Sequence, residues 1–445
     1  ARSAVQKTTT RYCGLVAAVD NVWSPSPSTT SSNAAILHDI NVLRQTTSRI
    51  VHRGPDGQKL TRGSMSTGGY GKWAMGHQRL AIVDPNSRTA DMPFRFDFHS
   101  SGKNMSGDSK VVNLAANGEI YNHKELYAEL VNEHGWKIDR GSQSDCEVIG
   151  HAYACLGPEE AVKRLDGMFA FVVFEEGDEA TGKAPRAFAA RDPVGIKPLY
   201  YAKTADGCGY AFASELKSLV GHVDTSTVKQ VPPGHYWTPE TGLVCYYNPD
   251  WLRKDDFAPW EEGKAPSIDE VREGFNAAVS KRMMADVDYG FFLSGGVDSC
   301  IVSQVLMPRY RAETGDDRPI PAFTVGMENS PDVMAARAMV DALGGERHVD
   351  HRQRVFTPEE VFNLIPKIIF HMETYETELI RSAIPNWLLA ERAGADVKMV
   401  LTGEGADELF AGYLYFMDAE NPRQIQNELR RIYGMLGDIN LHRTD

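Results

Sequence analysis

A cysteine near the amino end of the chain raises the first question of chemistry. Cys13 is followed by glycine and by the run LVAAV, which is typical of a short strand. A thiol in this position can be an ordinary buried side chain, or it can be a nucleophile. Twelve residues precede Cys13, so we expect nucleophilic chemistry only if they are removed.

A second segment combines glycines with hydroxyl and carboxyl side chains. The apolar run YGFFL leads into residues 294–299, SGGVDS, and a helix is expected to follow. Backbone N–H groups of such a loop can bind a phosphate or pyrophosphate at a helix N-terminus, and Ser294 and Ser299 add hydroxyl donors. The loop lacks the lysine of the common nucleoside-triphosphate loop, so Asp298 is the expected magnesium ligand. A plain tight turn is the alternative.

Carboxylates follow another apolar run, KMVL, in the segment LTGEGADELFAGY. If both runs belong to one parallel sheet, their carboxyl ends meet at the edge where open α/β sheets bind ligands. Asp407 can then complete the magnesium site begun by Asp298. Glu404 can act as a base or orient a nucleophile.

Composition limits the class of protein. The chain has 47 Lys and Arg against 60 Asp and Glu, a net charge of −13, and no basic cluster, so nucleic acid is not an expected partner. It has no run of eighteen apolar residues, so no membrane span is expected. Six scattered cysteines without C-x-x-C pairs suit a reducing compartment and indicate neither disulfides nor zinc.

The expected compartment is the cytoplasm. The first eleven residues contain Arg2, Lys7 and Arg11 and no acid, which is also compatible with the remnant of a mitochondrial or plastid transit peptide. A disordered tail is the simpler interpretation of the same residues.

The pattern along the chain predicts two domains of different class. An N-terminal extension or propeptide is expected over 1–12, an α+β domain over 13–247, a charged linker over 248–266 and an α/β domain over 267–445. Five short runs of the first domain read as strands, namely LAIVD, VVNLAANGEIY, MFAFVVFEE, PLYYA and AFASE. Helices are expected near 33–51 and at 143–155, and polar loops at 24–33 and 99–110.

In the second domain, strand-like runs alternate with helical segments, which favours a parallel sheet. A capping box at Ser267 precedes a helix whose Ile268, Val271, Phe275 and Val279 share one face. A further amphipathic helix is predicted at 422–436, with Ile425, Leu429, Ile432 and Tyr433 in phase. Its apolar face has no evident cover, so we expect a homodimer or a partner protein there.

Nine motifs in order resemble the glutamine-hydrolysing asparagine synthetase family over nearly the whole chain. They are HRGPDG, HQRLAIVD, NGEIYNHKEL, SDCEVI, LDGMFAF, RDPVGIKPLYY, SGGVDS, VGMENSPD and LTGEGADELFAGYLYF. The resemblance implies an amino-terminal-nucleophile glutaminase sandwich (αββα), followed by a parallel-sheet ATP-pyrophosphatase domain. It also implies that ATP and Mg²⁺ are used, with glutamine and aspartate as substrates.

The resemblance implies a glutamine site in the first domain. Cys13 would be the nucleophile, and its own α-amino group, which titrates at about 8, would take the thiol proton. Arg79 would hold the substrate carboxylate and Asp145 the ammonium group. Asn117 and Gly118 would form the oxyanion hole, worth roughly 3 kcal/mol per donor. The remaining positions that match the family's site are Leu80, Ala81, Ile82, Val83 and Glu119.

For the second domain, the resemblance implies that an aspartyl adenylate forms and that ammonia displaces AMP. The positions that match the family's nucleotide site are Phe292, Ser294, Gly295, Gly296, Asp298, Ser299, Val325, Thr402 and Gly403. Asp298 and Asp407 match the metal ligands. Arg381 matches an arginine that faces the phosphates.

Three features depart from the family pattern. Cys13 is not the first residue, Glu378 replaces a hydroxyl residue, and the chain ends before a helical region that carries a lysine for adenylation. The alternative to a working synthetase is therefore a degenerate relative that serves as a structural or interaction subunit. A relative that closes another amide is disfavoured, because Cys13 stands beside an intact HRGPDG and NGE.

Overall fold

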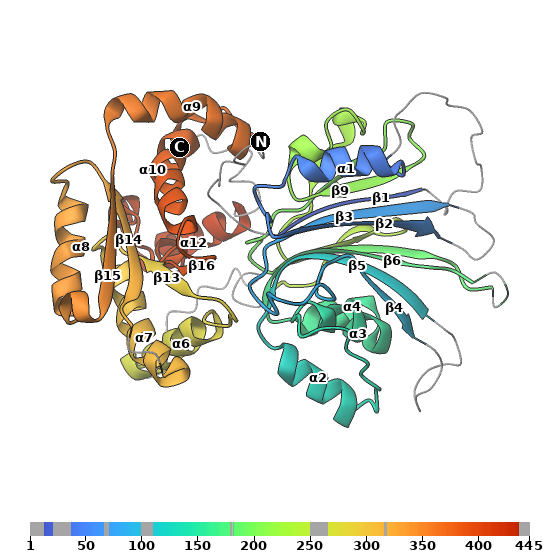
Figure 1. Cartoon of the computed structure of the whole chain (residues 1–445), viewed down its shortest axis with the longest axis horizontal. Helices are drawn as coiled ribbons and strands as arrows, with labels where there is room; N and C mark the ends of the chain where they lie inside the picture. Colours follow the sequence, from blue (N-terminus) through green and yellow to red (C-terminus); the bar gives the residue numbers. More distant parts are fainter. Residues whose placement is uncertain are drawn as a thin grey trace. The chain divides into compact units, whose positions relative to one another are not determined.

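The structure is a computed structural model, and it describes residues 13–20, 37–65, 71–98, 110–178, 180, 182–249, 266–315 and 318–435. The chain forms two compact units, one spanning Arg11–Asn248 and the other including Pro249–Asp445 (Figure 1). The extension at 1–12, the loops at 24–33 and 99–109 and nearly all of the expected linker lie outside the described residues.

The first unit contains two antiparallel sheets, each with six described strands. In order across the first sheet, the strands are β10 (Lys229–Gln230), β8 (Tyr200–Lys203), β9 (Gly209–Ala213), β1 (Gly14–Asp20), β3 (Lys72–Arg79) and β2 (Gly57–Ser64). Across the second sheet they are β12 (Gly242–Cys245), β11 (His235–Thr238), β7 (Arg186–Arg191), β6 (Gly167–Glu175), β5 (Lys110–Ile120) and β4 (Phe94–Phe98).

Helices cover the outer face of each sheet, which confirms the predicted αββα class. Figure 1 shows α1 outside the first sheet and α2, α3 and α4 outside the second. The bounds are α1 (Ile40–Ser48), α2 (His123–Asn132), α3 (Glu147–Leu156) and α4 (Pro158–Arg164), with short 3₁₀ turns η1 (Leu216–Ser218) and η2 (Thr225–Thr227).

The central strands are apolar on both faces because both faces are buried. In β1, Leu15, Ala17 and Val19 join the core between the two sheets, while Val16 and Ala18 pack in the cluster that includes Leu43 of α1. Alternate residues of a strand point to opposite faces, so one uninterrupted apolar run serves two cores.

Several predicted elements of this unit need correction. LAIVD was expected to be a strand, but 80–84 is irregular, since the Arg79 guanidinium binds the carbonyls of Val83 and Asp84 and Asp84 has a φ of 52°. The helix expected at 143–155 begins at Glu147, and the preceding turn holds Asp145. The pattern did not predict α2 or α4.

The second unit is built on a parallel sheet with the order β15, β14, β13, β16 among the described strands. Their bounds are β13 (Tyr289–Phe292), β14 (Ile320–Gly326), β15 (Val349–Val355) and β16 (Met399–Leu401). Figure 1 shows α8 and α10 on opposite sides of β14. The helices are α6 (Ile268–Lys281), α7 (Val297–Thr314), α8 (Pro331–Ala342), α9 (Pro358–Met372), α10 (Thr377–Gly394), α11 (Ala406–Phe410) and α12 (Pro422–Met435), with 3₁₀ turns η3 (Gly345–Arg347) and η4 (Leu414–Asp418).

Two amphipathic helices of this unit differ from their predicted burial. The capping box at Ser267 is present, but Ile268 is 78% exposed, so the apolar face of α6 begins to pack only farther along the helix. In α12 the expected uncovered face is partly covered, because Ile432 is buried and Ile425 is half-buried. Close before α12 in sequence, α11 and η4 carry large exposed apolar side chains, which include Leu409, Phe410, Leu414 and Met417.

No helix among the described residues combines the length and the apolar character needed to cross a lipid bilayer.

The contact between the two sheets of the first unit can be tested by removing one ring. Phe212 of β9 is fully buried and packs edge-on against Trp237 of β11 at 5.1 Å, so it joins the two sheets. Phe212→Ala should lower the free energy of unfolding by about 3–5 kcal/mol, measured by urea unfolding. Val220→Ala is the control, since Val220 is 60% exposed, and it should change little. Equal losses in both variants would contradict this packing.

Candidate functional site

The thiol of Cys13 lies against the backbone of Leu80. Leu80 N–H donates to Cys13 Sγ at 3.3 Å, and the thiol lies 3.6 Å from Leu80 O. The pairing of β1 with β3 produces this contact, because Gly14 is opposite Gln78 and the two strands run antiparallel. Burial raises the pKa of the Cys13 thiol to about 11, although the hydrogen bond from Leu80 opposes the shift. The thiol is therefore protonated at neutral pH until a base takes its proton.

A small pocket opens beside this thiol and gathers most of the predicted glutamine-site residues. It is lined by Cys13, Arg79, Leu80, Val83, Ala90, Met92, Gly118, Glu119, Ser144, Asp145 and Cys146. Ala81, Ile82 and Asn117 do not line it. Ala81 N–H donates to Asp56 Oδ2 at 2.9 Å, which fixes the start of the loop. Motifs about a hundred residues apart in sequence thus meet around one sulfur atom.

The β5 strand contributes a polar stretch to a buried place. Asn117 is fully buried, and neither its amide nitrogen nor its amide oxygen has a hydrogen-bond partner among the described residues. A buried amide without partners is costly, so it is typical of a site that supplies hydrogen bonds to a ligand. Gly118 has a φ of 152°, and a Cβ there would come within 2.0 Å of Met168 O, so only glycine fits.

Two carboxylates lie at the pocket. Burial and the neighbouring charge of Asp145 raise the pKa of Glu119 well above its usual value. Burial also raises the pKa of Asp145, opposed by the N–H of Ile120, which donates to Asp145 Oδ2 at 2.6 Å. Such a pair favours a cationic group, which is compatible with the predicted role of Asp145 toward an ammonium group.

Arg79 is engaged within the protein. Its two terminal nitrogens donate to Asp91 Oδ1 at 3.0 Å and to the carbonyls of Ser87, Val83 and Asp84 at 2.7–3.0 Å. These hydrogen bonds fix the conformation of the loop that begins at Leu80. The predicted pairing of Arg79 with a substrate carboxylate therefore requires some of these partners to be exchanged.

The predicted phosphate loop follows β13 directly. Ser294 Oγ lies 3.1 Å from Ser299 Oγ and accepts a hydrogen bond from Gly296 N–H at 3.2 Å, and α7 begins at Val297. Gly295 has a φ of 82°, and a Cβ there would meet Ala335 of α8 at 2.5 Å. The loop is thus a turn that only glycine allows, at the N-terminus of a long helix.

The other predicted nucleotide-site residues converge on the same edge. Phe291 of β13 is opposite Leu401 of β16, so Phe292, the last residue of β13, and Thr402, which directly follows β16, lie at the same edge of the sheet. A Cβ on Gly403 would come within 2.8 Å of Asp298 Cβ, so the loop after β16 lies against the start of α7. Val325 is near the carboxyl end of β14, beside β13.

Two carboxylates stand close together at this edge. Partial burial raises the pKa of Asp407, and the charges of Asp298 and Glu408 raise it further. Mg²⁺ in phosphate-binding sites is usually held by one or two carboxylates together with phosphate oxygens, so this pair fits the ion. Glu404, in the same loop, is exposed.

Arg381 is paired within its own helix. Near the start of α10, its guanidinium forms an ion pair with Glu378, and its side chain is 77% exposed. Glu378, which replaces the hydroxyl residue of the family pattern, has its negative charge neutralised by Arg381. A role of Arg381 toward phosphates requires this exposed pair to open.

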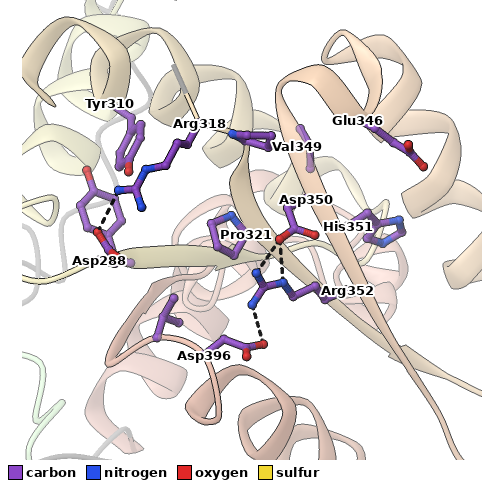
Figure 2. A pocket seen from close by; sticks show the side chains of 13 residues that line it. Asp288, Tyr310, Arg318, Pro321, Glu346, Val349, Asp350, His351, Arg352 and Asp396 are labelled. Carbon is purple, nitrogen blue, oxygen red and sulfur yellow. Dashed lines mark hydrogen bonds and ion pairs between the residues drawn. The ribbon is translucent and has the colours of Figure 1, made fainter. Parts of the chain in front are cut away.

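A pocket of about 650 Å³ lies at the opposite, amino edge of the parallel sheet (Figure 2). It contains none of the predicted site residues. Most of its charged side chains pair with one another: Arg352 contacts both Asp350 and Asp396, and Arg318 lies 3.5 Å from Asp288.

Comparisons with known proteins agree with this geometry. Family models for a glutamine amidotransferase domain and for asparagine synthase match residues 28–238 and 270–443. Asparagine synthetase [glutamine-hydrolyzing] 2 of Oryza sativa subsp. japonica is 38% identical over 391 residues, covering 86% of this chain and 58% of its own length. The Zea mays and Arabidopsis thaliana (number 3) asparagine synthetases are each 38% identical over 389 residues, again 86% of this chain and 59% and 60% of theirs.

The chain belongs to the asparagine synthetase family. It spans somewhat less than two thirds of the length of these curated relatives. The two matched segments include the pocket residues from Arg79 onward and the whole carboxyl edge of the parallel sheet.

A cluster of charged side chains that the sequence did not reveal holds the backbone at Cys13. Arg53 Nε donates to the carbonyl of Cys13 at 3.0 Å, and its terminal nitrogen binds Glu215 at 2.9 Å. His52 and Lys217 contact the same carboxylate at 3.0 and 2.6 Å. The motif HRGPDG contains His52 and Arg53, so it pointed to two members of the cluster. Glu215 follows β9, far along the chain, and only the fold brings it to them.

The stability of this cluster should depend on pH. Three cationic or polar partners hold the pKa of Glu215 far below its usual value despite burial. A lowered folded pKa means that this stabilisation is present above the unfolded value of about 4.3 and is lost as the pH falls below it. Glu215→Gln should therefore cost about 3 kcal/mol at pH 7, and the gap to the unchanged protein should narrow below about pH 4.

Urea unfolding at both pH values measures this effect. Glu160→Gln is the control, because Glu160 pairs with Lys163 at the surface and should give no measurable loss at pH 7. A gap for Glu215→Gln that stays constant with falling pH would contradict the assignment.

Proposed function

We propose that this chain carries the two half-reactions of a glutamine-hydrolysing asparagine synthetase. Residues 13–247 hydrolyse glutamine to glutamate and ammonia. Residues 267–445 carry the site at which aspartate and ATP give an aspartyl adenylate and pyrophosphate, and ammonia then displaces AMP to give asparagine. The observation that carries the proposal is the pocket where the Cys13 thiol meets Arg79, Gly118, Glu119 and Asp145.

In the glutaminase, Cys13 attacks the side-chain carbonyl carbon of glutamine, and the carbon–nitrogen bond breaks to release ammonia. Water then hydrolyses the resulting thioester, which gives glutamate and restores the thiol. The thiol proton of Cys13 passes to its own α-amino group once the preceding residues are removed, because a peptide nitrogen is not a base. Asn117 and Gly118 donate to the oxyanion, and the unpartnered buried amide of Asn117 supports this role. Asp145 and Glu119 receive the ammonium group, and Arg79 with the 80–83 segment receives the carboxylate end.

In the synthetase unit, the loop at 294–299 holds phosphates through backbone N–H groups and the Ser294 and Ser299 hydroxyls. Asp298 and Asp407 would hold Mg²⁺, which neutralises phosphate charge when bound. Phe292, Val325, Thr402 and Gly403 surround the adenosine part. Glu404 orients the nucleophile, and Arg381 reaches the phosphates after leaving Glu378.

A homodimer or a protein partner at the carboxyl-terminal helices and a cytoplasmic location complete the proposal. The exposed apolar side chains of α11 and η4 support a partner. The alternative, a degenerate relative that serves as a subunit, lacks a specific observation in its favour, since both sites retain their predicted side chains.

Glutamine hydrolysis should depend on exposing Cys13. A protein that begins at Cys13 should release glutamate from glutamine, whereas the chain with its preceding residues should not. Cys13→Ala in the shorter protein should abolish release, and Asp298→Asn, in the other unit, should leave it unchanged. Glutamate release is measured in a coupled assay. Equal rates with and without the preceding residues would disprove the α-amine mechanism.

Nucleotide binding should depend on Asp298. Asp298→Asn should weaken Mg-ATP binding at least about tenfold, equivalent to about 1.4 kcal/mol, in a calorimetric titration of the full chain. The variant and the unchanged protein should bind alike when EDTA removes the metal. Asp288→Asn, at the amino edge of the same sheet, is the matched control and should bind Mg-ATP normally. Unchanged affinity in Asp298→Asn would remove Asp298 from the metal site.

A further inference from the structure

Lys197 is a buried lysine that the proposed chemistry leaves unused. It is 4% exposed and stands in the motif RDPVGIKPLYY. Burying an ammonium group is costly unless nearby groups compensate its charge. Such a lysine therefore points to a specific electrostatic role.

The backbone of Lys197 is held rigidly. One carboxylate oxygen of Asp192 accepts hydrogen bonds from Val194, Gly195 and Ile196, and the other accepts from Lys197 N–H at 3.0 Å. Arg191, fully buried, donates from Nε to Lys197 O at 2.8 Å. The loop thus presents this side chain from one fixed position.

That position adjoins the pocket strand. Asp192 accepts from Phe169 N–H at 3.2 Å and donates its own N–H to Phe169 O at 2.8 Å. Phe169 is the register partner of Gly118 across the pairing of β6 with β5. Lys197 is therefore connected, through Asp192 and one strand residue, to the segment that carries Gly118 and Glu119.

The charges around the lysine identify its neighbours. Burial and the Arg53 cation lower the pKa of Lys197 to about 8, while the negative charges of Glu119, Cys13 and Asp192 oppose the shift. In return, Lys197 lowers the pKa of Cys13 and of Glu119. Lys197 does not line the pocket itself, but it interacts electrostatically with Cys13 and Glu119, which do.

The pocket needs such a cation. Glu119 and Asp145 already bring two carboxyl groups, and a Cys13 thiolate would add a third negative charge. The terminal N–H groups of Arg79 donate to Asp91 and to three carbonyls, and Arg53 forms an ion pair with Glu215. Both arginines are therefore already engaged.

We propose that Lys197 is the electrostatic positioning residue of the thiol pocket, where its ammonium group favours the ionised form of Glu119 and stabilises the Cys13 thiolate. The inference rests on the proposed function, but its test does not require the protein to hydrolyse glutamine. The expected signature is a change in how the reactivity of Cys13 depends on pH.

The experiment measures alkylation of Cys13 by iodoacetamide in the full chain between pH 7 and pH 10, with peptide mass spectrometry to separate Cys13 from the other cysteines. At pH 7, below the pKa of about 8 of Lys197, Lys197→Met should slow alkylation about tenfold, as expected for a rise of about one unit in the pKa of the thiol. Lys197→Arg, which keeps the charge, should restore most of the rate. Lys197→Gln is a second neutral variant and should be as slow as Lys197→Met.

Lys183→Met is the matched control, since Lys183 is a partly buried lysine of the same unit paired with Glu175 at 2.9 Å, and it should react like the unchanged protein. An unchanged rate in the folded neutral variants would overturn the proposal. So would an arginine variant as slow as the methionine variant, because packing alone would then explain the loss. Failure of glutamine hydrolysis in a protein that begins at Cys13 would instead count against the proposed function.

Discussion

The contact between the Cys13 sulfur and the backbone N–H of Leu80 is the constraint on which the first unit depends. It requires the exact register of β1 on β3, and it requires the chain to leave β3 in a loop rather than continue as a strand. Arg79 enforces that loop by binding its carbonyls, and Arg53 fixes the Cys13 carbonyl from the other side. These two arginines thus act on the backbone that surrounds the thiol.

Burial gives this pocket its electrostatic character. A thiol, two carboxyl groups and a lysine all lie in an environment that penalises charge, so each shifts in pKa toward its neutral form. The balance among them decides which group carries the proton when substrate enters. At the parallel sheet the situation differs, because Asp298, Asp407 and Glu404 lie at a more open edge, where two close carboxylates fit a divalent cation and phosphate.

Local sequence patterns predicted two kinds of element correctly. These are strands with both faces buried, which are apolar throughout, and helices whose apolar residues recur on one face. The apolar run YGFFL contains β13, and the capping box at Ser267 starts α6 as expected. The strand predicted at LAIVD was wrong because a tertiary interaction, the binding of the Arg79 guanidinium to carbonyls of this segment, overrides its strand propensity. The motifs placed Cys13, Gly118 and Asp145 in one site, but they could not reveal that Arg79 is engaged with its own loop. The roles of Glu215 and Lys197 could not be predicted from the sequence, because only the fold brings their segments close to the segment of Cys13.

The central claim is that the Cys13 pocket recognises glutamine and presents the thiol to its side-chain carbonyl. Covalent capture by a glutamine analogue with a diazoketone in place of the side-chain amide tests this claim most directly, in a protein that begins at Cys13. We predict one label per chain, on Cys13, and slower labelling in the presence of excess glutamine. Labels spread over Cys208, Cys245 and Cys300 according to exposure, or labelling of Cys13 that glutamine does not slow, would contradict the claim.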